Sequence, residues 1–369
     1  MKYPIGIQDF EDLQRNGYAY VDKTNFVYKL ADEGKYYFLS RPRRFGKSLF
    51  LSTLEAYFQG KKELFEGLAI YDLETEWKKY PIFHIDLNTA NFREKDSLYT
   101  VLNDYLTTWE SKYGTRESEA TLALRFKGVI ARAAEKEGCG VVILIDEYDK
   151  PILQTLRDPE LQAEHRAQLK AFYSVLKTQD RYIKFAFLTG VTKFGKVSVF
   201  SDLNNLTDIS MDHRYISICG MTEKELLTNF KEGIGELASA NEDNETETID
   251  KLRMRYSGYH FEENSEEIYN PFSVLNTLAN SRYDDYWFKA NTHTFLIDIL
   301  KKHDYCITDL NKAQVKANMM NNVDSNPIPV IYQSGYLTIK SYDERFKNYQ
   351  LGIPNKEVEE SILNIFSPL

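Results

Sequence analysis

Short apolar runs alternate with longer segments of helical spacing along the first part of the chain. Four runs rich in β-branched, aromatic or leucine residues predict buried strands, at residues 36–39, 82–86, 141–145 and 183–189. Apolar residues elsewhere recur every three or four positions and predict helices, at 48–58, 98–109, 122–133 and 161–177. A further apolar run at 215–219 predicts a fifth strand. Strands alternating with helical crossovers are typical of a doubly wound, mostly parallel sheet, so an α/β fold is expected.

The pattern changes after residue 221. Thr222 and Glu225 have the spacing of a capping box, which marks the start of a helix. Further helices are predicted at 249–256, after Asn270-Pro271, and at 292–302. Polar and apolar residues then alternate over 330–354, which predicts a β-hairpin with its turn near Asp343-Glu344.

Short helices followed by a hairpin indicate a winged-helix-like lid. We therefore expect two domains, a sheet core with an N-terminal segment over residues 1–221 and a helical, winged-helix-like lid over 222–369.

Residues 36–58 predict a strand, a turn and a helix in direct succession, and the turn ends in Gly46, Lys47 and Ser48. Backbone N–H groups at a helix N-terminus bind anions, a lysine ammonium reaches outer phosphates, and a hydroxyl binds magnesium. The stretch therefore predicts a phosphate loop, in which Lys47 is a catalytic residue and Ser48 a metal ligand. An ordinary strand-to-helix turn is the alternative for the tripeptide alone.

The loop departs from the general motif G-x-x-x-x-G-K-[ST] at its first position. Arg41 stands where the first glycine is expected, and the following Pro42 has no N–H to offer a phosphate. Arg43 and Arg44 add two further guanidinium groups, and we assign Arg44 the charge stabilisation of an arginine finger, with ion pairing as the alternative. The predicted nucleotide-binding residues are Arg41, Pro42, Arg43, Arg44, Phe45, Gly46, Lys47, Ser48 and Leu49.

Acidic residues follow the most apolar of the predicted strands. The run 141–145 leads directly into Asp146 and Glu147. Ligands of doubly wound sheets bind at the carboxyl ends of parallel strands. In an NTPase with this layout the first carboxylate holds magnesium and the second polarises the attacking water, so we assign Asp146 as metal ligand and Glu147 as catalytic. Asp149 is expected to cap the next turn, with assistance to the metal as the alternative.

Two threonines, Thr189 and Thr192, end the neighbouring predicted strand. Their hydroxyl groups have the chemistry to contact a γ-phosphate or to hold the attacking water, and we include both among the catalytic residues. An ordinary strand-end threonine remains the alternative for each.

Composition limits the partners of the protein. The 46 basic and 55 acidic residues leave a net charge of -9, which argues against a surface that coats nucleic acid, so phosphate binding must be local. The three cysteines are far apart and predict no disulfide framework or metal site. The N-terminus lacks the layout of a signal peptide, and no apolar run approaches the ~20 residues that span a bilayer, so a cytoplasmic protein with no membrane partner is expected.

Short motifs are spread along almost the whole chain: IQDF, YVDKT, RPRRFGKS, ILIDEYD, FLTGVTKF, YNPFS and YLTIKSYDERFKNYQLGIPN. Together they resemble the bacterial AAA-ATPase-like family, whose usual loop also carries arginines. The resemblance, to a group within the extended AAA and STAND-type P-loop NTPases, implies that a sensor strand lies between the two Walker strands.

Residue roles follow from the same resemblance. It implies that Lys47 and Ser48 are the Walker A pair and that Asp146 and Glu147 are the Walker B pair. Thr189 or Thr192 would be the first sensor. Asn270-Pro271 is similar to the lid motif that closes over the nucleotide.

Members of this family commonly continue for ~150 residues, about one further domain, into a PD-(D/E)XK nuclease-like domain. This chain ends at Leu369, so we expect either a shortened form or an ATPase-only form.

Three functions are compatible with these patterns. The leading hypothesis is a conformational switch with ATP as substrate and Mg2+ as cofactor, which regulates a partner or a nuclease-like effector; a homo-oligomer is also considered. A non-hydrolysing nucleotide-binding scaffold is the second. A winged-helix DNA-binding regulator is the third and rests on Lys340, Arg345 and Lys347.

Overall fold

The computed structural model describes residues 1–193, 203, 205–289, 310, 312–320 and 326–366. The chain forms two compact units. The sheet unit contains Thr24–Ser40 and Leu51–Ile209, and the helical unit contains Met1–Lys23, Arg41–Phe50 and Ser210–Leu369. The stretch that carries the expected phosphate loop therefore belongs to the helical unit. The division at residues 221 and 222 stays a prediction.

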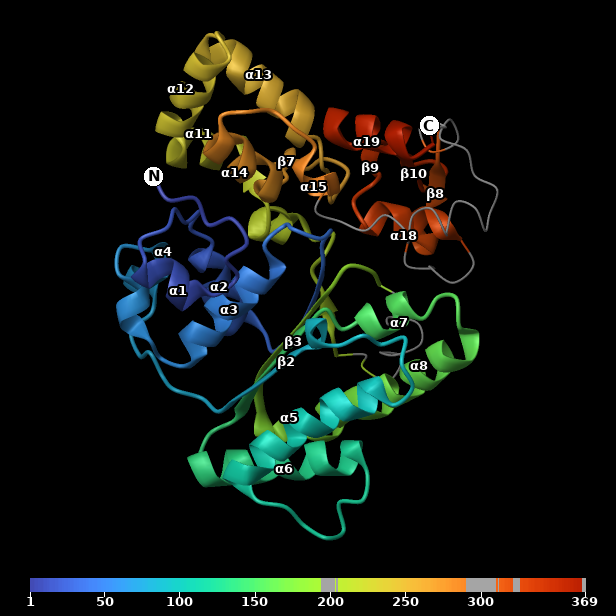
Figure 1. The fold of residues 1–369 in the computed structure, drawn as a ribbon. Coiled ribbons are helices and arrows are strands. Elements are labelled where there is room, and N and C mark those ends of the chain that lie inside the picture. Colours follow the sequence, from blue (N-terminus) through green and yellow to red (C-terminus); the bar gives the residue numbers. More distant parts are fainter. Residues whose placement is uncertain (194–202, 204, 290–309, 311, 321–325, 367–369) are drawn as a thin grey trace. The chain divides into compact units, whose positions relative to one another are not determined.

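The sheet unit is built on a five-stranded sheet, of which Figure 1 labels β2 and β3. The strand order is β2-β3-β4-β1-β5, and each pair of neighbours is parallel. The strands are β1 (Tyr36–Ser40), β2 (Ile82–Asp86), β3 (Val141–Asp146), β4 (Ile183–Gly190) and β5 (Thr207–Asp208). Every residue of β3 is buried, as expected for a central parallel strand covered on both faces. β4 lies between β3 and β1, where the family resemblance placed the sensor strand.

The predicted fifth strand at 215–219 is wrong. His213–Ile218 forms the 3-10 helix η4, and the fifth strand is β5, inside a stretch that shows no strand pattern. Tyr215, Ile216 and Ile218 are buried, which accounts for the apolar run. Burial alone does not distinguish a short strand from a short helix, and here the Asp212 side chain accepts a hydrogen bond from the N–H of Arg214 and starts helical geometry.

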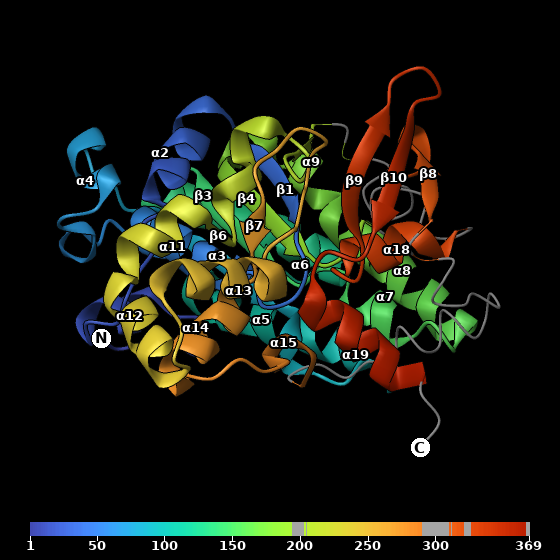
Figure 2. The same cartoon turned by 90° about the horizontal axis from the view of Figure 1, so that it is seen from above.

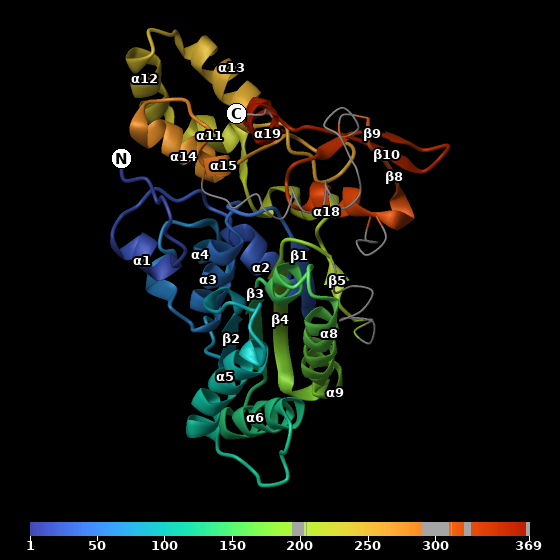
Figure 3. The ribbon, with the colours of Figure 1, turned by 45° about the vertical axis from the view of Figure 1, so that its right-hand side comes forward.

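The predicted helices of the sheet unit are present. The longer ones in or entering it are α2 (Thr24–Glu33), α3 (Lys47–Phe58), α5 (Ser97–Tyr113), α6 (Leu122–Glu137) and α8 (Pro159–Tyr173). The shorter ones are η1 (Lys62–Phe65), α4 (Ala69–Leu73), η2 (Leu87–Thr89), α7 (Lys150–Gln154), α9 (Val175–Thr178) and η3 (Asp180–Tyr182). α5 and α6 lie side by side, as Figure 3 shows. The rings of Phe126 and Phe172 stack at 4.3 Å and join α6 to α8.

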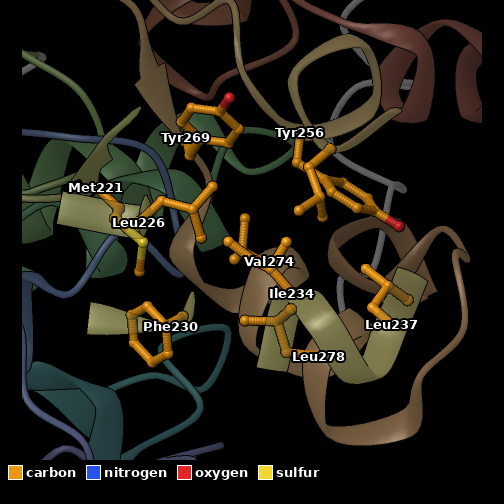
Figure 4. Close-up of a cluster of buried hydrophobic side chains, with 10 residues drawn as sticks. Met221, Leu226, Phe230, Ile234, Leu237, Tyr256, Tyr269, Val274 and Leu278 are labelled. Carbon is orange, nitrogen blue, oxygen red and sulfur yellow. The ribbon is translucent and has the colours of Figure 1, made fainter. Parts of the chain in front are cut away.

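The helical unit has a core of its own, drawn in Figure 4. Its helices include α1 (Phe10–Arg15), α11 (Glu223–Asn229), α12 (Lys231–Ala240), α13 (Glu245–Tyr256), α14 (Pro271–Asn280) and α15 (Tyr286–Lys289). A small antiparallel pair, β6 (Met221–Thr222) and β7 (Ile268–Tyr269), contributes Met221 and Tyr269 to this core. The capping box of Thr222 and Glu225 is confirmed, and the Asn270 side chain caps α14.

The C-terminal part of this unit contains an antiparallel sheet of order β8-β10-β9, visible in Figure 2. Its elements are β8 (Gln314–Lys316), η5 (Ala317–Met319), α18 (Pro327–Gln333), β9 (Thr338–Asp343), β10 (Asn348–Gly352) and α19 (Lys356–Phe366). The hairpin prediction is confirmed for β9 and β10 and wrong for 330–333, which belongs to the fully buried helix α18. The helix predicted at 292–302 lies outside the described residues.

Candidate functional site

The expected phosphate loop connects the end of β1, at Ser40, to the start of α3, at Lys47. Two of its residues have left-handed backbone, Gly46 at φ +94° and Arg44 at φ +70°. Glycine adopts this region freely, whereas an L-residue with a side chain loses roughly 1 kcal/mol there. A Cβ on Gly46 would meet no atom within 4 Å, so the backbone angle, and not lack of space, favours glycine.

The side chain of Lys47 turns back onto the loop. It is 3% exposed, and its Nζ donates to the carbonyl oxygens of Arg41 at 3.1 Å and Pro42 at 3.3 Å. Lys47 is also the first residue of α3, a 12-residue helix, so its ammonium lies close to the positive end of a helix dipole. Ser48 and Leu49 follow it and are half-buried. The loop thus holds a cation on its own main chain.

The Arg41 side chain is committed to the protein's own main chain. Its guanidinium is buried, and it donates to the carbonyls of Ser210 at 2.7 Å, Tyr215 at 3.3 Å and Ile216 at 3.4 Å. Its Cζ atom lies 4.0 Å from the centre of the Phe261 ring, within cation–π range. The Arg41 guanidinium is therefore held by carbonyls and an aromatic ring of the helical unit. The assignment of Arg41 as a nucleotide-binding residue stays a prediction.

Phe45 and Pro42 also anchor the loop. The buried Phe45 ring makes edge contacts with Tyr259 at 4.9 Å and with Phe261 at 5.8 Å, and its carbonyl accepts from the N–H of Gly220 at 2.8 Å. Pro42 packs against Gly335 so closely that a Cβ on that glycine would come within 2.8 Å of the proline ring. Both positions are therefore packing positions of the helical unit.

The two remaining arginines of the loop are exposed. The guanidinium of Arg44 lies 4.8 Å from the centre of the Phe272 ring, in the YNPFS motif. The main-chain carbonyl of Arg43 accepts a hydrogen bond from the indole Nε1 of Trp287 at 3.0 Å. Arg43 and Arg44 are thus the loop arginines whose side chains reach solvent.

In the sheet unit, β3 ends at Asp146, and Glu147 follows it directly. Asp146 is 3% exposed, and its Oδ1 accepts from the Thr189 hydroxyl at 2.5 Å and from the Glu147 N–H at 3.0 Å. Glu147 has a left-handed φ of +52°, which is uncommon for a glutamate. Backbone strain of this kind concentrates at functional sites, so it supports a functional role for this residue.

Asp149 binds the segment that follows β4. Its carboxylate is fully buried and accepts from the Thr192 N–H at 2.6 Å, the Thr192 hydroxyl at 2.5 Å and the Val191 N–H at 3.2 Å. Burial, together with the charge of Glu147, raises the pKa of Asp149 to about 6. Asp149 occupies the N-cap position of α7, but its side chain makes no capping hydrogen bond, so the expected cap is wrong.

Tyr148 completes this connection. Its N–H donates to the carbonyl of Thr189 at 3.0 Å and its hydroxyl to the carbonyl of Thr192 at 2.8 Å. The structure thus brings the four predicted residues of the sheet unit together in one hydrogen-bonded group, with Thr189 on Asp146 and Thr192 joined to the same segment through Asp149.

The donor set fits a magnesium ion. Mg2+ is bound through one or two protein carboxylates and keeps water and phosphate oxygens in its other positions. Asp146 has the chemistry of one such carboxylate, and its orientation is set by the Thr189 hydroxyl. Within the described part of the chain, no group of three or more His, Cys, Asp or Glu residues forms a metal cage.

The residues that sequence reasoning missed are the partners of the loop, above all Trp287, Tyr259 and Gly335. Nothing in their local pattern distinguishes them from ordinary core residues. The available signal lay in the loop itself, since arginine, proline and phenylalanine in place of flexible residues require packing partners.

A five-stranded parallel sheet with a Gly-Lys-Ser turn between β1 and α3 defines an α/β fold of the P-loop NTPase class. Residues 4–200 match the family described as "Predicted AAA-ATPase". An Azotobacter chroococcum mcd 1 protein, described as "Uncharacterized protein in vnfD 5'region", is 38% identical over 367 residues, covering 98% of this chain and 69% of the relative. The chain belongs to the AAA-ATPase-like family, which confirms the resemblance.

None of the helices in the described ranges combines the length and the apolar character needed to cross a bilayer.

Proposed function

We propose that the protein binds ATP at residues 41–49, hydrolyses it with Mg2+, and uses the nucleotide as a conformational switch that regulates a partner. The observation that carries the proposal is Lys47, whose buried Nζ rests on the carbonyls of Arg41 and Pro42 at the start of α3. In a phosphate loop the lysine ammonium reaches the outer phosphates, and this ammonium lies on the carbonyls of the loop itself. Membership of the AAA-ATPase-like family supports ATP as the nucleotide.

The remaining roles follow from the chemistry of phosphoryl transfer. The N–H groups at the start of α3 would face the phosphates, and Ser48 and Asp146 would hold the magnesium ion, which neutralises developing charge when bound. Glu147 would orient the attacking water. Thr189 fixes the carboxylate of Asp146, and Arg44, which is exposed, is the arginine proposed to stabilise charge in the transition state.

Phosphate release with and without Mg2+ tests this proposal. Lys47→Ala is expected to weaken ATP binding at least tenfold, and Glu147→Gln to retain binding but slow hydrolysis by about 100-fold or more, as for loss of a general base. The matched controls are Lys127→Ala and Glu164→Gln, which change exposed residues of α6 and α8. Parental binding by Lys47→Ala or parental turnover by Glu147→Gln would show that the assigned roles are wrong.

A non-hydrolysing nucleotide-binding scaffold is the second candidate. Pro42 lacks an N–H, and the Arg41 guanidinium is engaged by carbonyls, so the loop offers phosphate fewer donors than a glycine-rich loop. The same experiment separates the two functions. A rise in melting temperature with ATP but no phosphate release in the parent protein would favour the scaffold.

A further inference from the structure

Trp287 connects α15 to the phosphate loop within the helical unit. Its side chain is 1% exposed, and its indole Nε1 donates to the carbonyl of Arg43 at 3.0 Å. The two residues are 244 positions apart in the chain. No sequence motif indicated a role for this tryptophan, so its contact with the loop is visible only in the structure.

The tryptophan is itself fixed from several sides. Its main-chain N–H donates to Oε1 of Glu357 on α19 at 2.9 Å, and the same carboxyl group accepts from the Ser273 hydroxyl. Its ring meets the Tyr336 ring edge-on at 5.3 Å. A Cβ on Gly335, the glycine that packs against Pro42, would lie 3.5 Å from the indole. A donor held in this way has little freedom to follow a moving loop.

The hydrogen bond from Trp287 to the Arg43 carbonyl also affects the next amide of the loop. The carbonyl of Arg43 and the N–H of Arg44 belong to one planar, trans peptide unit, so they point in opposite directions. Holding the carbonyl on Trp287 therefore fixes the direction of the Arg44 N–H. Because Pro42 has no N–H, each remaining amide of the loop matters more for an anion than in a glycine-rich loop.

We propose that Trp287 is a positioning residue of the phosphate loop, which holds the Arg43 carbonyl so that the Arg44 N–H is presented to the nucleotide phosphates. This inference rests on the proposed nucleotide binding. It explains how a loop without its first glycine keeps the peptide between Arg43 and Arg44 in one orientation. Arg44 itself has left-handed backbone.

Trp287→Phe removes the indole N–H and keeps an aromatic ring. One lost hydrogen bond of about 0.5–1.5 kcal/mol predicts an ATP dissociation constant two- to tenfold higher. The matched control is Trp77→Phe, because the Trp77 indole also donates to a carbonyl at 3.0 Å, that of Glu74, in the sheet unit. Equal affinities of Trp287→Phe and the parent, or equal losses in both variants, would overturn the proposal.

Hydrogen exchange without nucleotide separates this inference from the proposed function. The amides of residues 43–46 are expected to exchange faster in Trp287→Phe than in the parent and in Trp77→Phe, whether or not ATP binds. Unchanged exchange would refute the positioning role even if the protein is an ATPase. If the parent shows no affinity for ATP, the proposed function fails, and this comparison alone decides whether Trp287 orders the loop.

A protein that keeps Trp287 tests the same idea without disturbing the contact. Phenylalanine at positions 77 and 109 leaves Trp287 as the single tryptophan of the chain. Its emission is expected to shift when ATP and Mg2+, or pyrophosphate, are added, because the hydrogen-bonded carbonyl belongs to the binding loop. Saturating ligand with unchanged emission would argue that the indole does not sense the loop.

Discussion

Asp149 shows how a single buried carboxylate holds two strand ends together. Three donors from Val191 and Thr192 point at it, and all are buried in the sheet unit. Its ionised form is disfavoured by burial, which raises its pKa to about 6, but each accepted hydrogen bond favours that form. Removal of this carboxylate would leave three buried donors without an acceptor. We expect that loss to cost more free energy than is gained by no longer burying one charge.

Asp149→Ala is therefore expected to lower the free energy of unfolding by about 2–4 kcal/mol, at roughly 1–3 kcal/mol for each unsatisfied buried group less the relief of burying the acid. Urea unfolding at pH 7 measures this loss. Asp104→Ala, an exposed position on α5, is the control and should change stability by less than about 0.5 kcal/mol. A variant at Asp149 that is as stable as this control would show that the three contacts are not stabilising.

At the scale of elements, the loop between β1 and α3 is held by long-range contacts. Arg41 donates to three carbonyls of the segment 210–216 and lies on the Phe261 ring. A glycine at this position would restore the general motif but remove all of these contacts. The structure therefore predicts that a glycine at position 41 lowers the stability of the protein, whereas the motif alone would predict a better phosphate loop.

Arg41→Gly is expected to lower the free energy of unfolding by about 3 kcal/mol, because hydrogen bonds from a charged donor and a cation–π contact are lost together. Thermal and urea unfolding measure the change. Arg116→Gly, at an exposed loop position, is the matched control. Equal stability of the two variants would mean that the guanidinium contacts contribute nothing.

The elements differ in how well the sequence predicts them. Residues 141–145 are apolar throughout because both faces of β3 are covered, and such a run is legible without a structure. The run 215–219 is apolar for another reason, burial in a 3-10 helix. Likewise, 330–333 continues into the hairpin pattern although Pro327 and Pro329 begin the buried helix α18. A run of apolar residues in the sequence thus predicts burial reliably. It distinguishes a strand from a helix only where the run is long enough for a repeat of two or of 3.6 residues to be recognised.

The sequence predicts some residues of the candidate site and not others. It indicates Gly46, Lys47, Asp146 and Glu147 because residues with the required chemistry lie next to each other at the ends of predicted strands and helices. The partners that hold the loop, such as Trp287 and Tyr259, come from distant positions that only tertiary packing joins to it. No property of the local sequence encodes those pairings.

At the scale of the whole molecule, pH acts on stability through Glu357. Burial raises the pKa of this carboxyl from about 4.5 to about 8, although hydrogen bonds from Trp287 and Ser273 oppose the shift. Asp285 raises this pKa further and Arg255 lowers it, and the hydroxyl groups of Tyr256 and Tyr259 also interact with the charge of Glu357. Because the folded protein binds this proton more tightly than the unfolded chain, the stabilisation is complete below about pH 4.5 and falls as pH rises toward 8.

As pH rises from about 4.5 to about 8, titration of Glu357 is therefore expected to lower the free energy of unfolding by up to about 1.4 kcal/mol per pH unit. Urea unfolding from pH 5.5 to 9 measures the slope. Glu357→Gln should flatten it, whereas Glu359→Gln, exposed on the same helix, should not. Parallel slopes for the parent and Glu357→Gln would refute the assignment.

The anchoring of the loop also limits how this protein can be recombined with its relatives. The helical unit is assembled from three separate chain segments, and the loop is the shortest of them. A chimera that took residues 210–369 from a relative but kept residues 41–50 would keep these contacts only where the relative also supplies the partners of the loop, such as Tyr259, Phe261 and Trp287. Substitutions in these two stretches are therefore expected to depend on each other, although some 160 residues separate them in the chain.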